Sequence, residues 1–206
     1  DAAVIFDRCS LSWSALRASV ALSALRLRTR SRAQLEVVAS LLGNGPYALV
    51  AVHAVQRAGG VVCPLNPGYT KEEVEHHLQN AQATRVVVDD DAQREWSVPS
   101  DSVHDRRCWL IVVRTHAVAS FLVRDHGASL PLDAIGMCLF TSGTTGKPKG
   151  VQLSDANLRQ HAVNCLEVLP LETDDLVLLP GLPLFHIYAI AVWTVALDKG
   201  VPVHSL

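Results

Sequence analysis

One stretch constrains this chain more than any other: LFTSGTTGKPKG, residues 139–150. It opens with apolar residues that suit the end of a buried strand, and it continues with hydroxyl, glycine and lysine residues. Glycine lets neighbouring backbone N–H groups turn toward one point, because it has no Cβ in the way. Hydroxyl groups and lysines add further donors and positive charge. A concave array of such donors binds phosphate, so the stretch indicates a polyphosphate ligand.

The candidate polyphosphate-binding residues are the hydroxyl, glycine and lysine residues of this stretch. A Walker loop, found in P-loop kinases and ATPases, needs a glycine, four residues and then Gly-Lys-Ser/Thr at the start of a helix. Here a proline follows Gly-Lys, and a threonine occupies the position of the first glycine, which disfavours that interpretation. The other alternative is a solvated hairpin with surface lysines. The candidate residues are Thr141, Ser142, Gly143, Thr144, Thr145, Gly146, Lys147 and Lys149.

The local backbone around this stretch can also be predicted. Pro148 lacks a backbone N–H, and three nearby glycines disfavour a helix. We therefore expect strands at residues 137–141 and 150–153 on either side of an exposed loop, with no helix starting at Lys147.

Thr141 through Val151 match, position by position, the signature loop of the adenylate-forming (AMP-binding) enzymes. That pattern reads hydrophobic-x-Ser/Thr-Ser-Gly-Thr-Thr-Gly-x-Pro-Lys-Gly-Val. The family includes acyl-CoA synthetases, 4-coumarate–CoA ligase, firefly luciferase and the adenylation domains of peptide synthetases. The resemblance implies ATP-dependent activation of a carboxylic acid to an acyl-adenylate, with Mg²⁺, followed by transfer to CoA as co-substrate. It also implies that Lys149 matters more than Lys147, because the latter position varies in the pattern.

A second segment, LPLFHIY at residues 182–188, resembles the Pro-Leu-Phe-His segment that follows the phosphate loop in acyl- and aryl-CoA ligases. Taken alone, a histidine among apolar residues is more often a hydrogen-bonded core histidine. The resemblance instead implies that His186 lines the carboxylate-binding site and that Tyr188 contacts the acyl group. Ala189 stands where the family usually has glycine, which implies a narrower space there.

The resemblance covers most of the chain. Residues 57–67, with the Tyr69-Thr70 and Glu72-Glu73 pairs after them, are similar to the family stretch that precedes the loop, and residues 12–16 are similar to its Thr-Tyr-x-x-Leu opening. The resemblance is weaker between residues 89 and 134.

Later family elements do not occur in these 206 residues. They are the Tyr-Gly-x-Thr-Glu stretch whose glutamate helps hold Mg²⁺, the aspartate for the ribose, and the carboxyl-terminal domain with its lysine. The resemblance therefore implies that residues 1–206 are a partial AMP-binding (adenylation) domain of an acyl- or aryl-CoA ligase, without the carboxyl-terminal domain. The alternative is a non-catalytic fragment or pseudoenzyme that at most binds nucleotide. Because the chain opens on Asp1, we expect it to begin inside a longer gene product.

Composition excludes several classes of partner. A net charge of -2 gives no basic face for nucleic acid. The five cysteines are odd in number and widely spaced, which favours a reduced intracellular protein, cytoplasmic or peroxisomal, over a secreted one. We expect no transmembrane segment, because no apolar run approaches the length of a membrane span.

The consecutive aspartates at 89–91 are interpreted as a solvated loop, so no metal ligand is predicted. The expected partners are small molecules: a carboxylic acid, ATP and CoA.

Hydrophobic periodicity predicts the fold class. Strands alternate with amphipathic helices, which indicates βαβ units and an α/β fold with a mostly parallel, helix-covered sheet. The most specific local signal is the capping box Thr70-Lys71-Glu72-Glu73, which predicts a helix over 71–81. The other expected helices are residues 14–27 (with Ser14 as N-cap), 46–58, 118–123, 155–168 (with Ser154 as N-cap) and 187–197; the expected strands are 35–42, 61–63, 85–88, 110–113, 135–140, 151–153, 176–179 and 201–204.

Overall fold

The structure is a computed structural model that describes residues 2–6, 9–27, 36–88, 109–112, 135–141, 148–179 and 181–205. Three sequence predictions lie wholly outside these residues: the short helix over 118–123, the solvated loop at 89–91 and the structure of residues 142–147.

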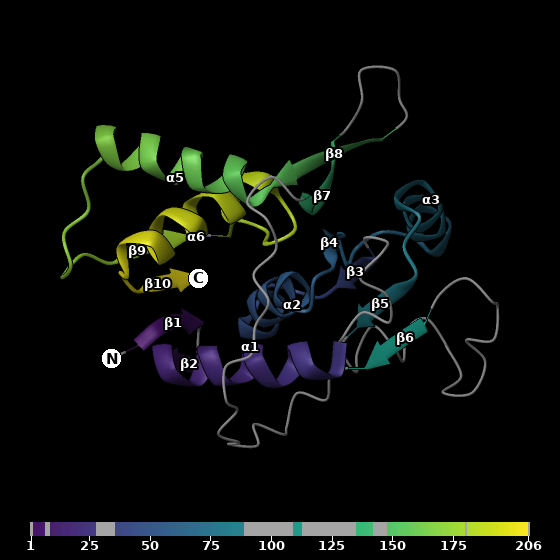
Figure 1. Ribbon diagram of the computed structural model, residues 1–206, viewed down its shortest axis with the longest axis horizontal. Coiled ribbons are helices and arrows are strands. Elements are labelled where there is room, and N and C mark those ends of the chain that lie inside the picture. Colours follow the sequence, from purple (N-terminus) through teal and green to yellow (C-terminus); the bar gives the residue numbers. More distant parts are fainter. Residues whose placement is uncertain are drawn as a thin grey trace.

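A six-stranded sheet carries the larger part of the chain (Figure 1). Its strand order is β6-β5-β3-β4-β7-β8, and every neighbouring pair is parallel except the last. This arrangement confirms the mostly parallel sheet expected from the sequence. Its strands are β3 (Val37–Leu41), β4 (Val61–Pro64), β5 (Arg85–Val88), β6 (Trp109–Val112), β7 (Ile135–Thr141) and β8 (Lys149–Ser154).

A second, four-stranded sheet was not anticipated. Its order is β2-β1-β10-β9, in which β1 and β2 form an antiparallel hairpin and β1 lies parallel to β10. The β1–β2 hairpin comes from one end of the chain and β9 and β10 from the other, so no local pattern predicts the pairing of β1 with β10. They are β1 (Ala2–Phe6), β2 (Cys9–Ser12), β9 (Val177–Leu179) and β10 (Val203–Ser205).

The described helices are α1 (Trp13–Leu27), α2 (Pro46–Arg57), α3 (Lys71–Ala81), α5 (Asp155–Val168) and α6 (Ile187–Lys199). In Figure 1, α5 and α6 lie side by side next to the four-stranded sheet, and an extensive α5–α6 contact agrees with this view. Among the described residues, no helix is long and apolar enough to cross a membrane.

Capping fixes several helix ends. Both α3 and α5 have the predicted bounds, and each begins with a capping box in which the cap side chain accepts a bond from the third helical residue. The predicted cap of α1 was wrong. The backbone N–H of Ala15 donates to Ser12 Oγ at 3.2 Å, so Ser12 rather than Ser14 caps this helix. Helix α6 continues past the predicted Leu197 and ends at Gly200, whose φ of 77° suits glycine.

Two apolar cores lie on opposite faces of the six-stranded sheet. The first core joins α1, α2 and α6 to both sheets, and the second lies between the sheet and α3. Because side chains alternate along a strand, β7 contributes to both cores. Met137 and Leu139 are buried in the first core, whereas Cys138 is buried in the second and Phe140 packs against it.

Candidate functional site

The base of the predicted phosphate loop is an antiparallel hairpin. Strands β7 and β8 pair up to their open end, where Thr141 lies opposite Lys149. Both residues are exposed, and the Thr141 hydroxyl donates to the Lys149 carbonyl at 3.5 Å, which is long for such a bond. The strand that begins at Lys149 leaves no room for a helix running on from Lys147, so the Walker interpretation is excluded.

The hairpin opens at the carboxyl end of β7, the edge at which α/β sheets bind ligands. Thr141 and Lys149 lie at this edge, and their roles in phosphate binding stay predictions. The other six candidates lie outside the described residues, and their roles stay predictions. They are Ser142, Gly143, Thr144, Thr145, Gly146 and Lys147.

His186 lies at the surface, at the start of α6. Its ring Nδ1 accepts a hydrogen bond from the backbone N–H of Tyr188 at 3.2 Å, so the side chain acts as the helix N-cap. An accepting Nδ1 carries no proton, which assigns the proton of the neutral ring to Nε2. The alternative of a buried core histidine is therefore wrong for His186, because its side chain is exposed and presents an Nε2–H donor.

Tyr188 follows on the first turn of α6 with 59% of its surface exposed. Its phenol thus offers an aromatic face and a hydroxyl at the same surface as His186. Ala189, in contrast, is fully buried in the first core. Its methyl group packs among core side chains, and the narrower space implied at this position stays a prediction.

Asn44 makes long-range contacts that the sequence did not predict. Its side-chain amide donates to the Leu182 carbonyl at 3.0 Å and accepts from the Leu184 N–H at 2.9 Å. The loop after β3 is thereby tied to the segment that carries His186. In the sequence, Asn44 lies between two glycines, a pattern typical of a turn, and no local signal identifies its distant partner.

A second link joins α2 to α6. Trp193 Nε1 donates to His53 Nε2 at 2.8 Å. Burial lowers the pKa of His53 to about 4, although the charge of Asp155 and a hydrogen bond with Gln56 act in the opposite direction. His53 is therefore neutral at neutral pH, as an acceptor of the indole N–H must be.

The two candidate segments share one apolar core. Leu184 is buried in the first core with Met137 and Leu139 of β7. Because Leu184 precedes His186 by two residues and Leu139 precedes Thr141 by two, the core supports both the His186 segment and the hairpin. The predicted phosphate and carboxylate residues are thus held by a common scaffold.

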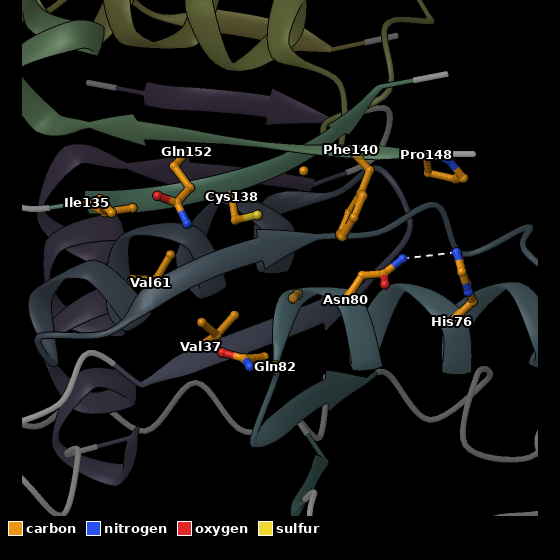
Figure 2. A pocket seen from close by; sticks show the side chains of 12 residues that line it. Val37, Val61, His76, Asn80, Gln82, Ile135, Cys138, Phe140, Pro148 and Gln152 are labelled. Carbon is orange, nitrogen blue, oxygen red and sulfur yellow. Dashed lines mark hydrogen bonds between the residues drawn. The ribbon is translucent and has the colours of Figure 1, made fainter. Parts of the chain in front are cut away.

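A cavity of about 560 Å³ lies on the other face of β7 and β8, next to α3 (Figure 2). Pro148 and Gly150 line one part of it, but His186 and Tyr188 do not. Figure 2 shows polar side chains of α3, including His76 and Asn80, across from Cys138 and Phe140 of β7. The predicted carboxylate residues are therefore separate from this cavity. No group of three or more His, Cys, Asp or Glu side chains that could hold a metal ion is found among the residues that the structure describes.

Known proteins resemble the whole chain. A 2-succinylbenzoate–CoA ligase of Listeria innocua is 27% identical over 204 residues, which are 99% of this chain and 41% of that protein. The chain thus spans about two fifths of the length of this relative.

Solved structures of other proteins are similar to this chain as well. A double mutant of o-succinylbenzoate CoA synthetase from Bacillus subtilis, bound to a product analogue, matches with a TM-score of 0.83 and 25% identity, over 100% of this chain and 41% of that one. ATP-bound MatB from Rhodopseudomonas palustris matches with a TM-score of 0.83 and 25% identity, over 100% and 42%. The model of the family described as "AMP-binding enzyme" matches residues 1–206. Because this family model covers the whole chain and the fold agrees with it, the chain belongs to the AMP-binding, adenylate-forming enzyme family.

Proposed function

We propose that this chain is the amino-terminal part of an ATP-dependent acid–CoA ligase, and that residues 1–206 form part of its adenylation domain. The observation that carries the proposal is the exposed hairpin opening at the carboxyl end of β7, where Lys149 faces solvent directly after the loop sequence typical of the family. The reaction would convert a carboxylic acid and ATP to an acyl-adenylate and pyrophosphate, and then transfer the acyl group to CoA.

In the first half-reaction the carboxylate oxygen attacks the α-phosphorus, and pyrophosphate leaves. The chain's contribution is to bind the polyphosphate and neutralise the charge that develops on the leaving group. Lys149 supplies a cation for this purpose and Thr141 a hydroxyl donor, and the glycine and hydroxyl residues at 142–146 supply the other donors.

His186 and Tyr188 would bind the acid. The Nε2–H of His186 is a donor suited to a carboxylate oxygen, and the exposed ring of Tyr188 offers apolar area to the acyl group. The 4-coumarate–CoA ligase type is a candidate within the family.

Mg²⁺ accompanies ATP in the family chemistry. Polyphosphate oxygens and carboxylates are its usual ligands. The described residues contain no cluster of such side chains, so no magnesium ligand is assigned to them. The chain's own residues bind and orient the polyphosphate and the acid.

The test compares two proteins. The first is the 206-residue chain. The second is a hybrid ligase, in which residues 1–206 replace the matching portion of the Listeria innocua 2-succinylbenzoate–CoA ligase. Pyrophosphate release is measured with ATP, Mg²⁺, CoA and a panel of fatty and aromatic acids, with the parent ligase as positive control.

We expect the 206-residue chain to bind ATP without forming acyl-CoA, and the hybrid ligase to release pyrophosphate only when an acid is present. A hybrid ligase that is folded and binds ATP but forms no acyl-adenylate with any acid would favour the alternative, a non-catalytic nucleotide-binding fragment. The predicted cytoplasmic or peroxisomal location stays a prediction.

A further inference from the structure

Two cysteines that are distant in sequence lie side by side in the six-stranded sheet. Strands β4 and β7 are parallel neighbours, with Val62 opposite Met137. The next residue on each strand is a cysteine, so Cys63 lies opposite Cys138. Both side chains belong to the second core and hence point to the same face of the sheet.

Their geometry suits a covalent bond. Neighbouring strands lie about 4.8 Å apart, and disulfides join residues whose Cα atoms are about 4.4–6.8 Å apart. The two thiols are register neighbours on one face of the sheet, close enough for each to shift the pKa of the other. Closing the bond therefore requires little backbone movement.

The two thiols differ in acidity. The hydrogen bond from Cys63 lowers the pKa of Cys138 to about 7, although burial acts in the opposite direction. The same hydrogen bond and burial raise the pKa of Cys63 well above its ordinary value. Near neutral pH a substantial share of Cys138 is therefore thiolate, next to a Cys63 thiol. The thiolate is the reactive form of cysteine.

Cys138 is also the member that a reagent can reach. It lines the cavity between β7, β8 and α3, whereas Cys63 does not. Figure 2 shows its side chain on the sheet side of that cavity, between those of Gln152 and Phe140. Cys63 is fully buried, whereas 8% of the Cys138 surface is exposed, at the cavity, so Cys138 is the more accessible member of the pair.

We propose that Cys63 and Cys138 form a paired-thiol modification site, in which Cys138 reacts with a small disulfide in the cavity and Cys63 resolves the product to a protein disulfide. In the first step the Cys138 thiolate attacks one sulfur of the reagent, forms a mixed disulfide and expels one reagent thiolate. In the second step Cys63, which gives up its proton to solvent or to the expelled thiolate, attacks the Cys138 sulfur and expels the other. The protein loses two hydrogen atoms, and the reagent disulfide is reduced to two thiols.

The experiment uses the folded 206-residue chain in which Cys9, Cys108 and Cys165 are replaced by serine. Glutathione disulfide is the reagent. After alkylation of the remaining thiols, the mass of the intact chain and of its unreduced peptides is measured. We expect the loss of two hydrogen masses, a Cys63–Cys138 cross-linked peptide and full reversal by dithiothreitol.

Two variants separate the roles of the thiols. Cys63→Ser lacks the resolving thiol, so we expect it to accumulate one stable glutathione adduct on Cys138. Cys138→Ser should form neither adduct nor cross-link, because Cys63 is shielded. Circular dichroism confirms that each variant is folded.

The same treatment of the chain with all its native cysteines tests the proposal without any substitution. A cross-link between Cys63 and Cys138 there supports the proposal. A glutathione adduct on Cys138 that persists without a cross-link, or a cross-link that joins either residue to Cys165 instead, would overturn it.

Discussion

The two segments that carry the candidate site are held in different ways. At the hairpin opening, Thr141 and Lys149 are joined by strand pairing and one long hydroxyl bond, and their side chains are exposed. The segment before α6 is held by two side-chain bonds from Asn44, by the buried Leu184 and by the N-cap at His186.

The comparison indicates how each segment works. Exposed cationic and hydroxyl groups at the hairpin opening contribute little to folding, and in the proposed function they bind the polyphosphate. The His186 segment, in contrast, depends on contacts that also stabilise the fold, so its geometry is set before any ligand arrives. Substitutions at the hairpin opening should therefore change activity alone, whereas substitutions around His186 should change activity and stability together.

The largest expected effect comes from Lys149→Ala in the hybrid ligase. Loss of a cation that stabilises the departing pyrophosphate should slow adenylate formation by about 10²–10³-fold, judging from the loss of single oxyanion donors. The free energy of unfolding should stay unchanged, because Lys149 is exposed. Pyrophosphate release and urea denaturation measure the two quantities. Lys147→Ala is the matched control, and an equal or larger effect there would contradict the assignment.

The next effect concerns pH and the link between α2 and α6. The pKa of His53 is about 4 in the folded chain, against an ordinary 6.5, so the unfolded chain binds more protons between these values. Stability should therefore be fully present above pH 6.5 and fall as the pH is lowered toward 4, by at most about 3 kcal/mol.

Urea denaturation at pH 7 and pH 4.5 checks this expectation. His53→Gln keeps an acceptor for Trp193 but does not titrate, so the difference between the two pH values should shrink in this variant. An unchanged difference would show that other groups cause the loss.

Asn44→Ala tests the His186 segment directly. The substitution removes two hydrogen bonds, each of which contributes about 0.5–1.5 kcal/mol, so we expect a loss of about 1–3 kcal/mol in stability. In the hybrid ligase the KM for the acid should rise and the KM for ATP should stay the same. Asn80→Ala is the control, because Asn80 is exposed and bonds only to His76 of its own helix. A lower stability with an unchanged KM for the acid would confine Asn44 to a folding role.

The smallest effect compares the two capping boxes. Ser154→Ala and Thr70→Ala should each lower the free energy of unfolding by about 1 kcal/mol, since each removes a bond to a helix N-terminus. Only Ser154 ends the strand that leaves the hairpin, so only Ser154→Ala should also weaken ATP binding by the chain. Equal ATP affinities in the two variants would show that the start of α5 does not affect ATP binding at the loop.

The sequence predicted well what local chemistry determines. The predicted N-caps Thr70 and Ser154 marked the starts of α3 and α5, and Pro148 with its neighbouring glycines predicted the hairpin in place of a helix. Contacts between residues that are far apart in the sequence could not be predicted from local patterns. Strands β1 and β10 lie at opposite ends of the chain, and Asn44 bonds to residues far along the sequence.

The pairing of Cys63 with Cys138 has the same cause. Their positions become neighbours only through the register of β4 and β7, which no spacing of cysteines reveals. For the candidate site itself, Thr141 and Lys149 were identified from the chemistry of the loop sequence, and His186 and Tyr188 from the family resemblance. The contacts that hold His186 in place required the structure.

The two faces of β7 have a thermodynamic consequence. One strand carries core residues on one side, Cys138 on the other and Thr141 at its end. If the binding of a polyphosphate at that end favours one position of β7, it also shifts the equilibrium between the dithiol and the disulfide. Linkage is reciprocal, so oxidation of the pair must then change the affinity for the polyphosphate by the same factor. Measuring ATP affinity in the reduced and oxidised chain therefore gives the coupling free energy between the loop and the thiols.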